Sequence, residues 1–173
     1  MAATPTATPS ELFARLAALG IETVTHGHPP LFTVEESKAL RGDLPGGHCK
    51  SLFLRDKKRR LWLAVMLEDR AIDMKALRTL IGGAGSLSFG SPELLDEVLG
   101  VAPGSVTPFA LINDTGHRLT VVLDAEMLGL DPLNYHPLTN TATTAIAPKD
   151  LIRFVEACGH EAHVLDLSPA TRA

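Results

Sequence analysis

The sequence has little cysteine and no long hydrophobic segment, and each absence excludes a class of protein. Only two cysteines occur among 173 residues, so the chain has no disulfide framework and is expected to be a reduced cytoplasmic protein. No apolar run approaches the ~20 residues that a membrane-spanning helix needs. Met1 to Pro9 lacks the basic and apolar regions of a signal peptide, and we expect it to form a frayed tail.

The charge of the chain limits its partners. A formal net charge of −4 argues against nonspecific binding along duplex DNA, which requires a broadly basic face. One group of cations is nevertheless concentrated in the sequence, and it consists of Arg55, Lys57, Lys58, Arg59 and Arg60. This group forms either a solvated hairpin tip or a local contact with RNA.

Several catalytic signatures are also missing. No glycine-rich phosphate motif follows a predicted strand, and no Gly-x-Ser-x-Gly elbow is present. Cys158, His160 and His163, like His26 and His28, lack the spacing of an established zinc site. We therefore expect no metal and no other cofactor.

Local patterns predict the helices and strands of one domain over residues 10–168. Helical spacing and capping residues predict helices over residues 10–19, 33–40, 74–81, 92–99 and 148–158. Alternating or β-branched segments predict strands over residues 21–26, 50–55, 61–66, 86–89, 108–112, 119–123 and 163–167. The strands at 108–112 and 119–123 are expected to form a hairpin. Because the helices do not alternate regularly with strands, the pattern favours an α+β fold with a mixed, mostly antiparallel sheet surrounded by helices.

The segment from Asn134 to Ile146 is unusually polar for a predicted strand region. It combines one His, two Asn and four Thr with Pro137. His136 precedes this proline, so its backbone is extended and its side chain has a defined direction. The imidazole is either a structural group or a proton carrier. Thr139, Asn140, Thr143 and Thr144 form either a polar edge strand or a surface that recognises ribose or amide groups.

Lys50 begins a hydrophobic strand that also carries Leu52 and Leu54 on the same face. A lysine in this position extends to solvent or meets an anion. The preceding Gly46-Gly47 pair favours the second alternative, because glycine lets the backbone approach a ligand closely. Gly104 to Pro108 is similarly either a plain connection or a loop that closes over a substrate.

Taken in order, four segments resemble a known family. They are Gly46 to Leu54, Leu87 to Gly90, Leu99 to Phe109, and Tyr135 to Thr144. The chain resembles free-standing aminoacyl-tRNA deacylases of the YbaK/ProX type, which are related to the editing insertion domain of bacterial prolyl-tRNA synthetase. The resemblance covers roughly Leu12 to Leu167 and implies the YbaK/prolyl-tRNA synthetase-associated domain fold. Within the family, the chain is most similar to the branch that removes alanine from proline tRNA.

The resemblance implies a function and a set of site residues. The expected reaction is metal-independent hydrolysis of the aminoacyl ester of Ala-tRNA(Pro), with Cys-tRNA(Pro) or Ser-tRNA as alternative substrates. Lys50 matches the essential lysine and His136 a histidine of the same pocket. Substrate-binding positions are expected at His48, Gly104, Ser105, Val106, Pro108, Thr139, Asn140, Thr143 and Thr144.

The expected partners follow from the same resemblance. The mischarged tRNA is contacted through its 3′ aminoacyl end and its acceptor stem, the latter by Lys57, Lys58, Arg59, Arg60 and Arg78, with Arg70 and Lys75 as further candidates. Prolyl-tRNA synthetase is a further candidate partner. Leu31, Phe32 and Val34 are expected to set the width of the pocket. A non-catalytic regulator that binds aminoacyl-tRNA or the synthetase, and a metal-dependent hydrolase, remain alternatives.

Overall fold

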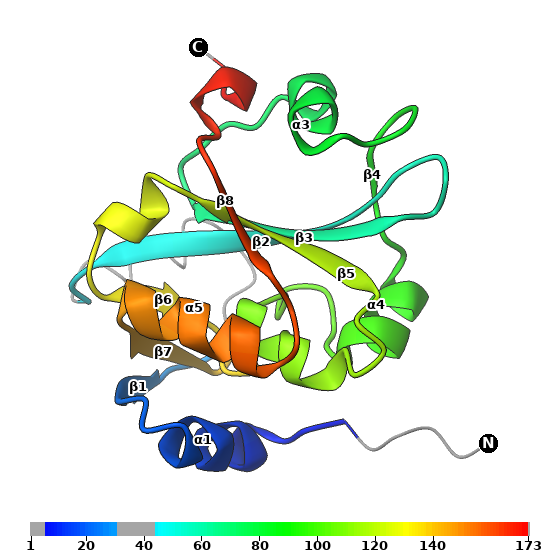
Figure 1. Ribbon diagram of the computed structural model, residues 1–173. Coiled ribbons are helices and arrows are strands. Elements are labelled where there is room, and N and C mark those ends of the chain that lie inside the picture. Colours follow the sequence, from blue (N-terminus) through cyan, green and yellow to red (C-terminus); the bar gives the residue numbers. More distant parts are fainter. Residues whose placement is uncertain (1–5, 31–43, 173) are drawn as a thin grey trace.

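A computed structural model describes residues 6–30 and 44–172, in which eight strands form one mixed sheet (Figure 1). The strand order is β1-β7-β6-β2-β3-β5-β8, with β4 paired to β2. The strands are β1 Thr23–Gly27, β2 Gly47–Arg55, β3 Leu61–Leu67, β4 Ser88–Phe89, β5 Leu119–Asp124, β6 Leu133–Tyr135, β7 Ala142–Ile146 and β8 Ala162–Leu165. The pairs β1–β7, β2–β3, β2–β4 and β6–β7 are antiparallel, whereas β2–β6, β3–β5 and β5–β8 are parallel. The predicted α+β class is confirmed.

Capping residues account for where several of the helices begin and end. They are α1 Pro9–Ala18, α3 Met74–Ile81, α4 Pro92–Leu99 and α5 Pro148–Ala157, with short 3-10 helices η1 Pro108–Asn113, η2 Met127–Gly129 and η3 Ser168–Ala170. Asp73 and Ser91 accept backbone N–H groups at the starts of α3 and α4, as predicted. Gly82 ends α3 at a φ of 78°, a conformation that favours glycine. The helix predicted over residues 33–40 lies outside the described residues.

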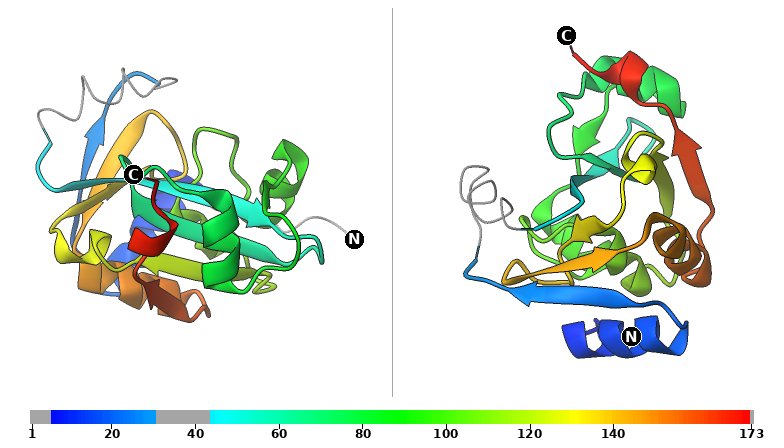
Figure 2. Two further views of the ribbon diagram at one scale, coloured as in Figure 1. Left: turned by 90° about the horizontal axis from the view of Figure 1, so that it is seen from above. Right: turned by 90° about the vertical axis from the view of Figure 1, so that its left-hand side faces the viewer.

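The first described residues contact the domain. Thr8 and Glu11 form a capping box at the start of α1. Ala7 N–H donates to Asn113 Oδ1 at 2.9 Å. Figure 2 shows α1 packed beneath β1, at the opposite end of the molecule from α3 and η3. Leu12 and Leu16 of α1 are buried in the main core.

The predicted hairpin between residues 108–112 and 119–123 is wrong. Residues Pro108–Asn113 form η1, whose start is capped by the Thr107 hydroxyl accepting the Phe109 N–H. Pro108 favours this geometry because its φ is already near the helical value and it has no N–H to donate to a strand. β5 instead pairs in parallel with β3 and β8, which are distant in sequence.

Alternation along β2 divides the hydrophobic residues between two faces of the sheet. Phe53 belongs to the larger core, which α1, α4 and α5 cover. Leu52 and Leu54 belong to a second core with residues of α3 and η3. Strand periodicity of two residues explains the division.

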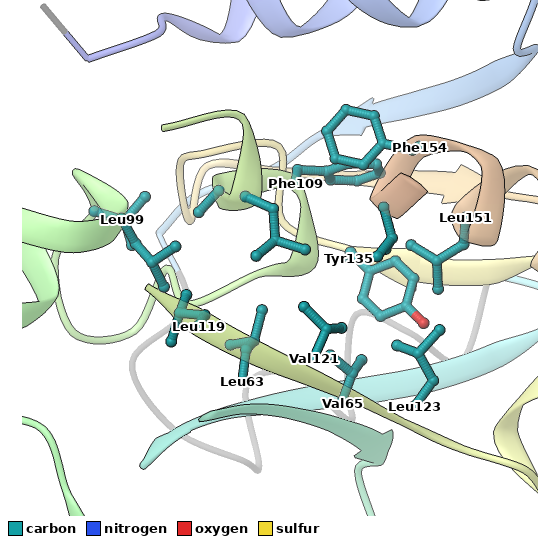
Figure 3. Packing of buried hydrophobic residues seen from close by; sticks show 14 of the residues in the cluster. Leu63, Val65, Leu99, Phe109, Leu119, Val121, Leu123, Tyr135, Leu151 and Phe154 are labelled. Atoms are coloured by element: carbon teal, nitrogen blue, oxygen red, sulfur yellow. The ribbon is translucent and has the colours of Figure 1, made fainter. Parts of the chain in front are cut away.

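The larger core is built around three aromatic rings (Figure 3). Phe109 of η1 makes edge contacts with Tyr135 of β6 and with Phe154 of α5, at centroid distances of 5.9 and 5.5 Å. Such edge contacts are favourable beyond simple burial. Because Tyr135 immediately precedes His136, this aromatic contact fixes the backbone at the start of the polar segment.

Asp114 connects the end of η1 to the start of β5 from a buried position. Its carboxylate accepts the Arg118 and Leu119 N–H groups, both at 3.0 Å, and contacts His160 Nε2 at 2.8 Å. Burial alone would raise the pKa of Asp114, but these hydrogen bonds lower it below the usual value. A carboxylate used in this way is costly to remove, because three donors lose their acceptor.

We expect Asp114→Ala to lower the free energy of unfolding by about 3 kcal/mol, measured by urea denaturation at pH 7. The pKa of Asp114 is depressed in the fold, so its stabilisation is complete above the unfolded-state value of ~3.9 and is lost as the pH falls below it. Asp96→Ala, at an exposed position of α4, is the control and should change the free energy by less than ~0.5 kcal/mol. Equal effects of the two substitutions would contradict the role of Asp114.

Candidate active site

The candidate site lies at an interruption in the pairing of β2. On one edge, β6 pairs only with Gly47 and His48, and β4 pairs only with Leu54 and Arg55. β6 ends where His136-Pro137 follows, since proline has no N–H for the ladder. In the described ranges, no strand pairs with residues 49–53 on this edge.

Main-chain groups of β2 point into the interruption. The Gly47 carbonyl accepts the Asn134 side-chain amide, and the Phe53 carbonyl accepts the Gly90 N–H on the same edge. Because successive residues alternate between the two edges, Ser51 also directs its N–H and C=O groups there, beyond the end of the ladder with β6. A ligand in this position can therefore bond to the backbone of an incomplete sheet.

A pocket of about 100 Å³ opens beside this edge. Its walls come from β2, β6 and β7, the end of β3, and the loop before η1. The lining residues are Leu44, His48, Cys49, Ser51, Glu68, Val106, Asn134, Tyr135, His136 and Thr143. The structure thus brings together four residues predicted for the site, His48, Val106, His136 and Thr143.

His136 has a defined tautomer when its imidazole is neutral. Its Nδ1 lies 3.1 Å from the Ala142 carbonyl oxygen, across the turn between β6 and β7. A carbonyl oxygen can only accept, so Nδ1 carries the proton and Nε2 keeps a lone pair. Burial lowers the pKa of His136, the Ala142 contact raises it, and nearby His28 lowers it further, with a net decrease from the ordinary value. The neutral ring is therefore favoured, with Nε2 as a proton acceptor.

Lys50 shares its sheet face with Leu52 and Leu54, as predicted, and does not line this pocket. Its ammonium donates to the Arg70 carbonyl at 2.6 Å. Burial lowers the pKa of Lys50, Asp69 raises it and Arg70 lowers it, with a net decrease. An ammonium has three N–H donors, and the Arg70 carbonyl takes one of them.

Arg70 is a buried residue that links the end of β3 to the end of β5, and it is not a surface cation. Its guanidinium donates to Asp124 at 2.9 Å and also contacts Glu126 and Thr171. These contacts fix the backbone carbonyl that receives Lys50. They also make Arg70, which is 8% exposed, unavailable for an RNA phosphate.

The Gly46-Gly47 pair accommodates protein backbone. A Cβ on Gly46 would lie 2.1 Å from the Pro132 carbonyl oxygen, and Gly46 has a φ of 98°. A Cβ on Gly47 would lie 3.0 Å from Leu130. The sequence predicted close approach of a ligand to this pair, but in the structure the segment before β6 makes that approach.

Cys49 lies in the pocket wall but is poorly suited to be a nucleophile. Burial raises the pKa of its thiol to about 11, despite hydrogen bonds from Tyr135 and Asn134 that lower it. Cysteine reacts as the thiolate, which is scarce at neutral pH when the pKa is this high. Cys49 is therefore a poor candidate for a covalent nucleophile.

Several predicted substrate-binding residues have other surroundings. Gly104 is exposed, Ser105 and Pro108 are buried, and only Val106 of that loop reaches the pocket. Thr139 bonds to Thr141 within the turn between β6 and β7. Asn140 is half-buried in this turn, outside the pocket wall, and Thr144 faces Thr25, with the two hydroxyl oxygens 2.8 Å apart. Leu31, Phe32 and Val34 lie outside the described residues.

Sequence reasoning missed part of the pocket wall. Asn134 donates to the carbonyls of Pro45 and Gly47 and so ties β6 to the start of β2. The position of Asn134 at the start of the polar segment could have indicated that it lines the site. Glu68 follows β3, and no motif in the sequence marked it. Ser51 lies in the same segment as Lys50, but the sequence pattern pointed to Lys50 and not to Ser51.

The basic residues form a separate surface at the far end of β2. Lys57 and Arg78 line a groove of about 660 Å³ together with Lys75. Arg60 is held by Asp56 at 2.9 Å and lies over the ring of Trp62. Lys58 and Arg59 are exposed in the turn between β2 and β3. From Ser51 to Lys57 an extended chain advances roughly 20 Å, so this surface is distinct from the pocket.

Comparison with known proteins places the chain in a family. The family described as "Aminoacyl-tRNA editing domain" matches residues 28–154. The chain belongs to this aminoacyl-tRNA editing domain family, which confirms the predicted resemblance. The prolyl-tRNA editing protein ProX of Acetoanaerobium sticklandii is 34% identical over 157 residues, covering 90% of this chain and 95% of that protein.

Other similar proteins agree with this result. Prolyl-tRNA synthetase associated domain-containing protein 1 of Mus musculus is 40% identical over 161 residues, with coverage of 91% of this chain and 95% of that protein. A solved structure described provisionally as a trans-editing enzyme for prolyl tRNA synthetase has a TM-score of 0.71 and 22% identity. It covers 98% of this chain and 100% of that one, and at this identity it shows the fold alone.

The described part of the chain contains neither a cluster of potential metal ligands nor a membrane-spanning helix. Among residues 6–30 and 44–172, no three His, Cys, Asp or Glu side chains are grouped closely enough to hold a metal ion. No helix in the described part of the chain combines the length and hydropathy needed to cross a bilayer.

The geometry of His136 predicts a specific titration. Nitrogen-15 NMR should show the neutral ring with its proton on Nδ1, and a midpoint below the ordinary value of 6.5 because burial opposes the charged form. The spectrum of His136→Gln identifies the signal. A neutral ring protonated on Nε2, or a midpoint above 6.5, would contradict the proposed proton acceptor.

Proposed function

We propose that this chain is a trans-editing hydrolase that deacylates mischarged tRNA(Pro), with Ala-tRNA(Pro) as its substrate. Membership of the editing family supports the reaction class. The observation that carries the proposal is the small pocket that contains His136, with Nδ1 bound to Ala142 and Nε2 left as an acceptor. An aminoacyl ester is already activated, so orientation of water and stabilisation of charge can suffice for hydrolysis.

The proposed reaction uses His136 first as a base. Its Nε2 takes a proton from water while the water oxygen forms a bond to the ester carbonyl carbon. The carbonyl oxygen becomes negatively charged in the tetrahedral intermediate. Collapse of the intermediate breaks the bond to the ribose oxygen, which receives the proton from the imidazolium. The products are the free amino acid and the uncharged tRNA.

Lys50 is proposed to supply the positive charge. The half-buried ammonium lies on the same strand as the pocket residues and has donors beyond the one that Arg70 takes. A long lysine side chain can reorient from the carbonyl to a phosphate or ester oxygen of the substrate. In this proposal the Arg70 carbonyl holds Lys50 in the absence of substrate.

The size of the pocket supports a small aminoacyl group. A cavity of about 150 Å³ accommodates benzene, so the volume of about 100 Å³ favours fewer heavy atoms. Editing by size is useful because a synthetase gains only ~1–3 kcal/mol of discrimination per missing methylene. Removal of alanine in a second pocket provides the remaining discrimination.

Deacylation of Ala-, Cys-, Ser- and Pro-tRNA(Pro), with and without EDTA, tests the substrate. We expect rapid release of alanine, slow release of proline, and no effect of the chelator. Faster release of cysteine or serine would reassign the substrate within the family. If all four esters stay intact while the tRNA binds, the protein is a non-catalytic binder and the proposed function is wrong.

Lys50→Ala should lower the deacylation rate by about 100-fold, because one charged donor near a developing oxyanion contributes on this scale. His136→Gln should cause a loss of about 10²-fold by removing the general base. Lys149→Ala, at an exposed position of α5, is the matched control and should leave the rate unchanged. Activity of Lys50→Ala equal to that of the native protein would remove Lys50 from the site and leave the function intact.

The groove lined by Lys57, Lys75 and Arg78 is proposed to contact acceptor-stem phosphates, next to the exposed Lys58 and Arg59 and to Arg60. We expect Lys57→Ala combined with Lys75→Ala to raise KM for the tRNA by about tenfold near 50 mM salt, with kcat unchanged. The difference in KM between the variant and the native protein should shrink at high salt, because salt also screens the attraction between the native cations and the phosphates. A lower kcat with the native KM would contradict this role.

A further inference from the structure

His28 lies beside the pocket and connects two of its residues. The imidazole follows β1, and its Nε2 is 2.8 Å from the Thr143 hydroxyl oxygen. Its ring also contacts the His136 ring edge-on, at a centroid distance of 6.4 Å. Thr143 and His136 both line the pocket, whereas His28 is not one of its lining residues.

The second nitrogen of His28 determines the direction of this hydrogen bond. Its Nδ1 is 2.9 Å from the Pro29 carbonyl oxygen, which can only accept. Nδ1 therefore carries the single proton of the neutral imidazole, and Nε2 is an acceptor. It follows that the Thr143 hydroxyl donates its proton to His28.

This direction decides what Thr143 offers to the pocket. A hydroxyl has one proton and two lone pairs. With its proton directed at His28, Thr143 can only accept from a molecule in the pocket. His136 Nε2 is likewise an acceptor when its ring is neutral, because Nδ1 donates to Ala142. The pocket wall thus presents two acceptors from neighbouring side chains.

We propose that His28 is a positioning residue that makes Thr143 an acceptor, so that the attacking water is held through both of its O–H groups. One proton of the water is directed at His136 Nε2 and the other at Thr143 Oγ1. A water bound in this way presents a lone pair to the ester carbon. The inference rests on the proposed hydrolase function and adds His28 to its machinery.

Both protons of the attacking water have a defined destination in this step. Attack forms the bond from the water oxygen to the carbonyl carbon, and His136 takes the first proton. The second proton stays on the attacking oxygen next to Thr143. When the bond to the ribose oxygen breaks, that oxygen takes the first proton from His136, and the second leaves with the carboxyl group of the amino acid.

Three substitutions separate this role from packing. His28→Leu removes the acceptor and keeps bulk, whereas His28→Gln can place an amide oxygen near the former Nε2. We expect His28→Leu to lower kcat about tenfold, the equivalent of one net hydrogen bond, with KM changed less than about twofold. His28→Gln should restore most of kcat. His26→Leu is the matched control, because His26 is exposed and lies directly opposite Thr143 in the β1–β7 register.

A double-mutant cycle completes the test. Thr143→Val keeps the shape of the side chain and should lower kcat to a similar extent. Once the hydroxyl is absent, adding His28→Leu should cause no further loss. Additive losses, or failure of His28→Gln to restore kcat, would show that His28 acts by packing and would overturn the inference. Native protein that hydrolyses no aminoacyl-tRNA refutes the proposed function, whereas active native protein with an unimpaired His28→Leu variant refutes the role of His28 alone.

Discussion

The interrupted edge of β2 is the constraint on which the site depends. One long strand pairs with β6 at its start and with β4 at its end, while β3 covers its other edge. Among the described residues, neither partner on the first edge extends to the middle of the strand, so this part of the edge has no strand partner there. Unpaired edges are normally protected in proteins, and here the edge borders a pocket whose walls carry polar side chains.

The alternation of β2 separates two kinds of chemistry. Cys49 and Ser51 belong to the pocket wall, whereas Lys50 projects to the face shared with α3 and is held by the Arg70 carbonyl. The Lys50 ammonium is therefore held by a main-chain acceptor outside the lining of the pocket. Arg70 in turn is fixed by Asp124, so the position of the lysine depends on a buried ion pair between the end of β3 and the end of β5.

The turn between β6 and β7 organises the acceptor side of the pocket. The Ala142 carbonyl sets the tautomer of His136, and His28 sets the direction of the Thr143 hydroxyl. Backbone carbonyls have only one role in hydrogen bonding, so they determine the roles of the side chains that they contact. Two flexible choices, a ring tautomer and a hydroxyl rotation, are thereby decided by the backbone.

The sequence alone determined the features that depend on neighbouring residues. The caps at Asp73 and Ser91, the β2–β3 hairpin and the face shared by Lys50, Leu52 and Leu54 follow from local geometry, and the quoted segments indicated the family correctly. Only the tertiary structure decided that Pro108–Asn113 is a 3-10 helix, that β5 pairs in parallel with distant strands, and that Thr143 but not Thr144 reaches the pocket. The tertiary structure also showed that Gly46-Gly47 lies against Pro132, that Glu68 lines the pocket, and that His28 contacts Thr143. These outcomes depend on contacts between segments far apart in the chain, which no local pattern records.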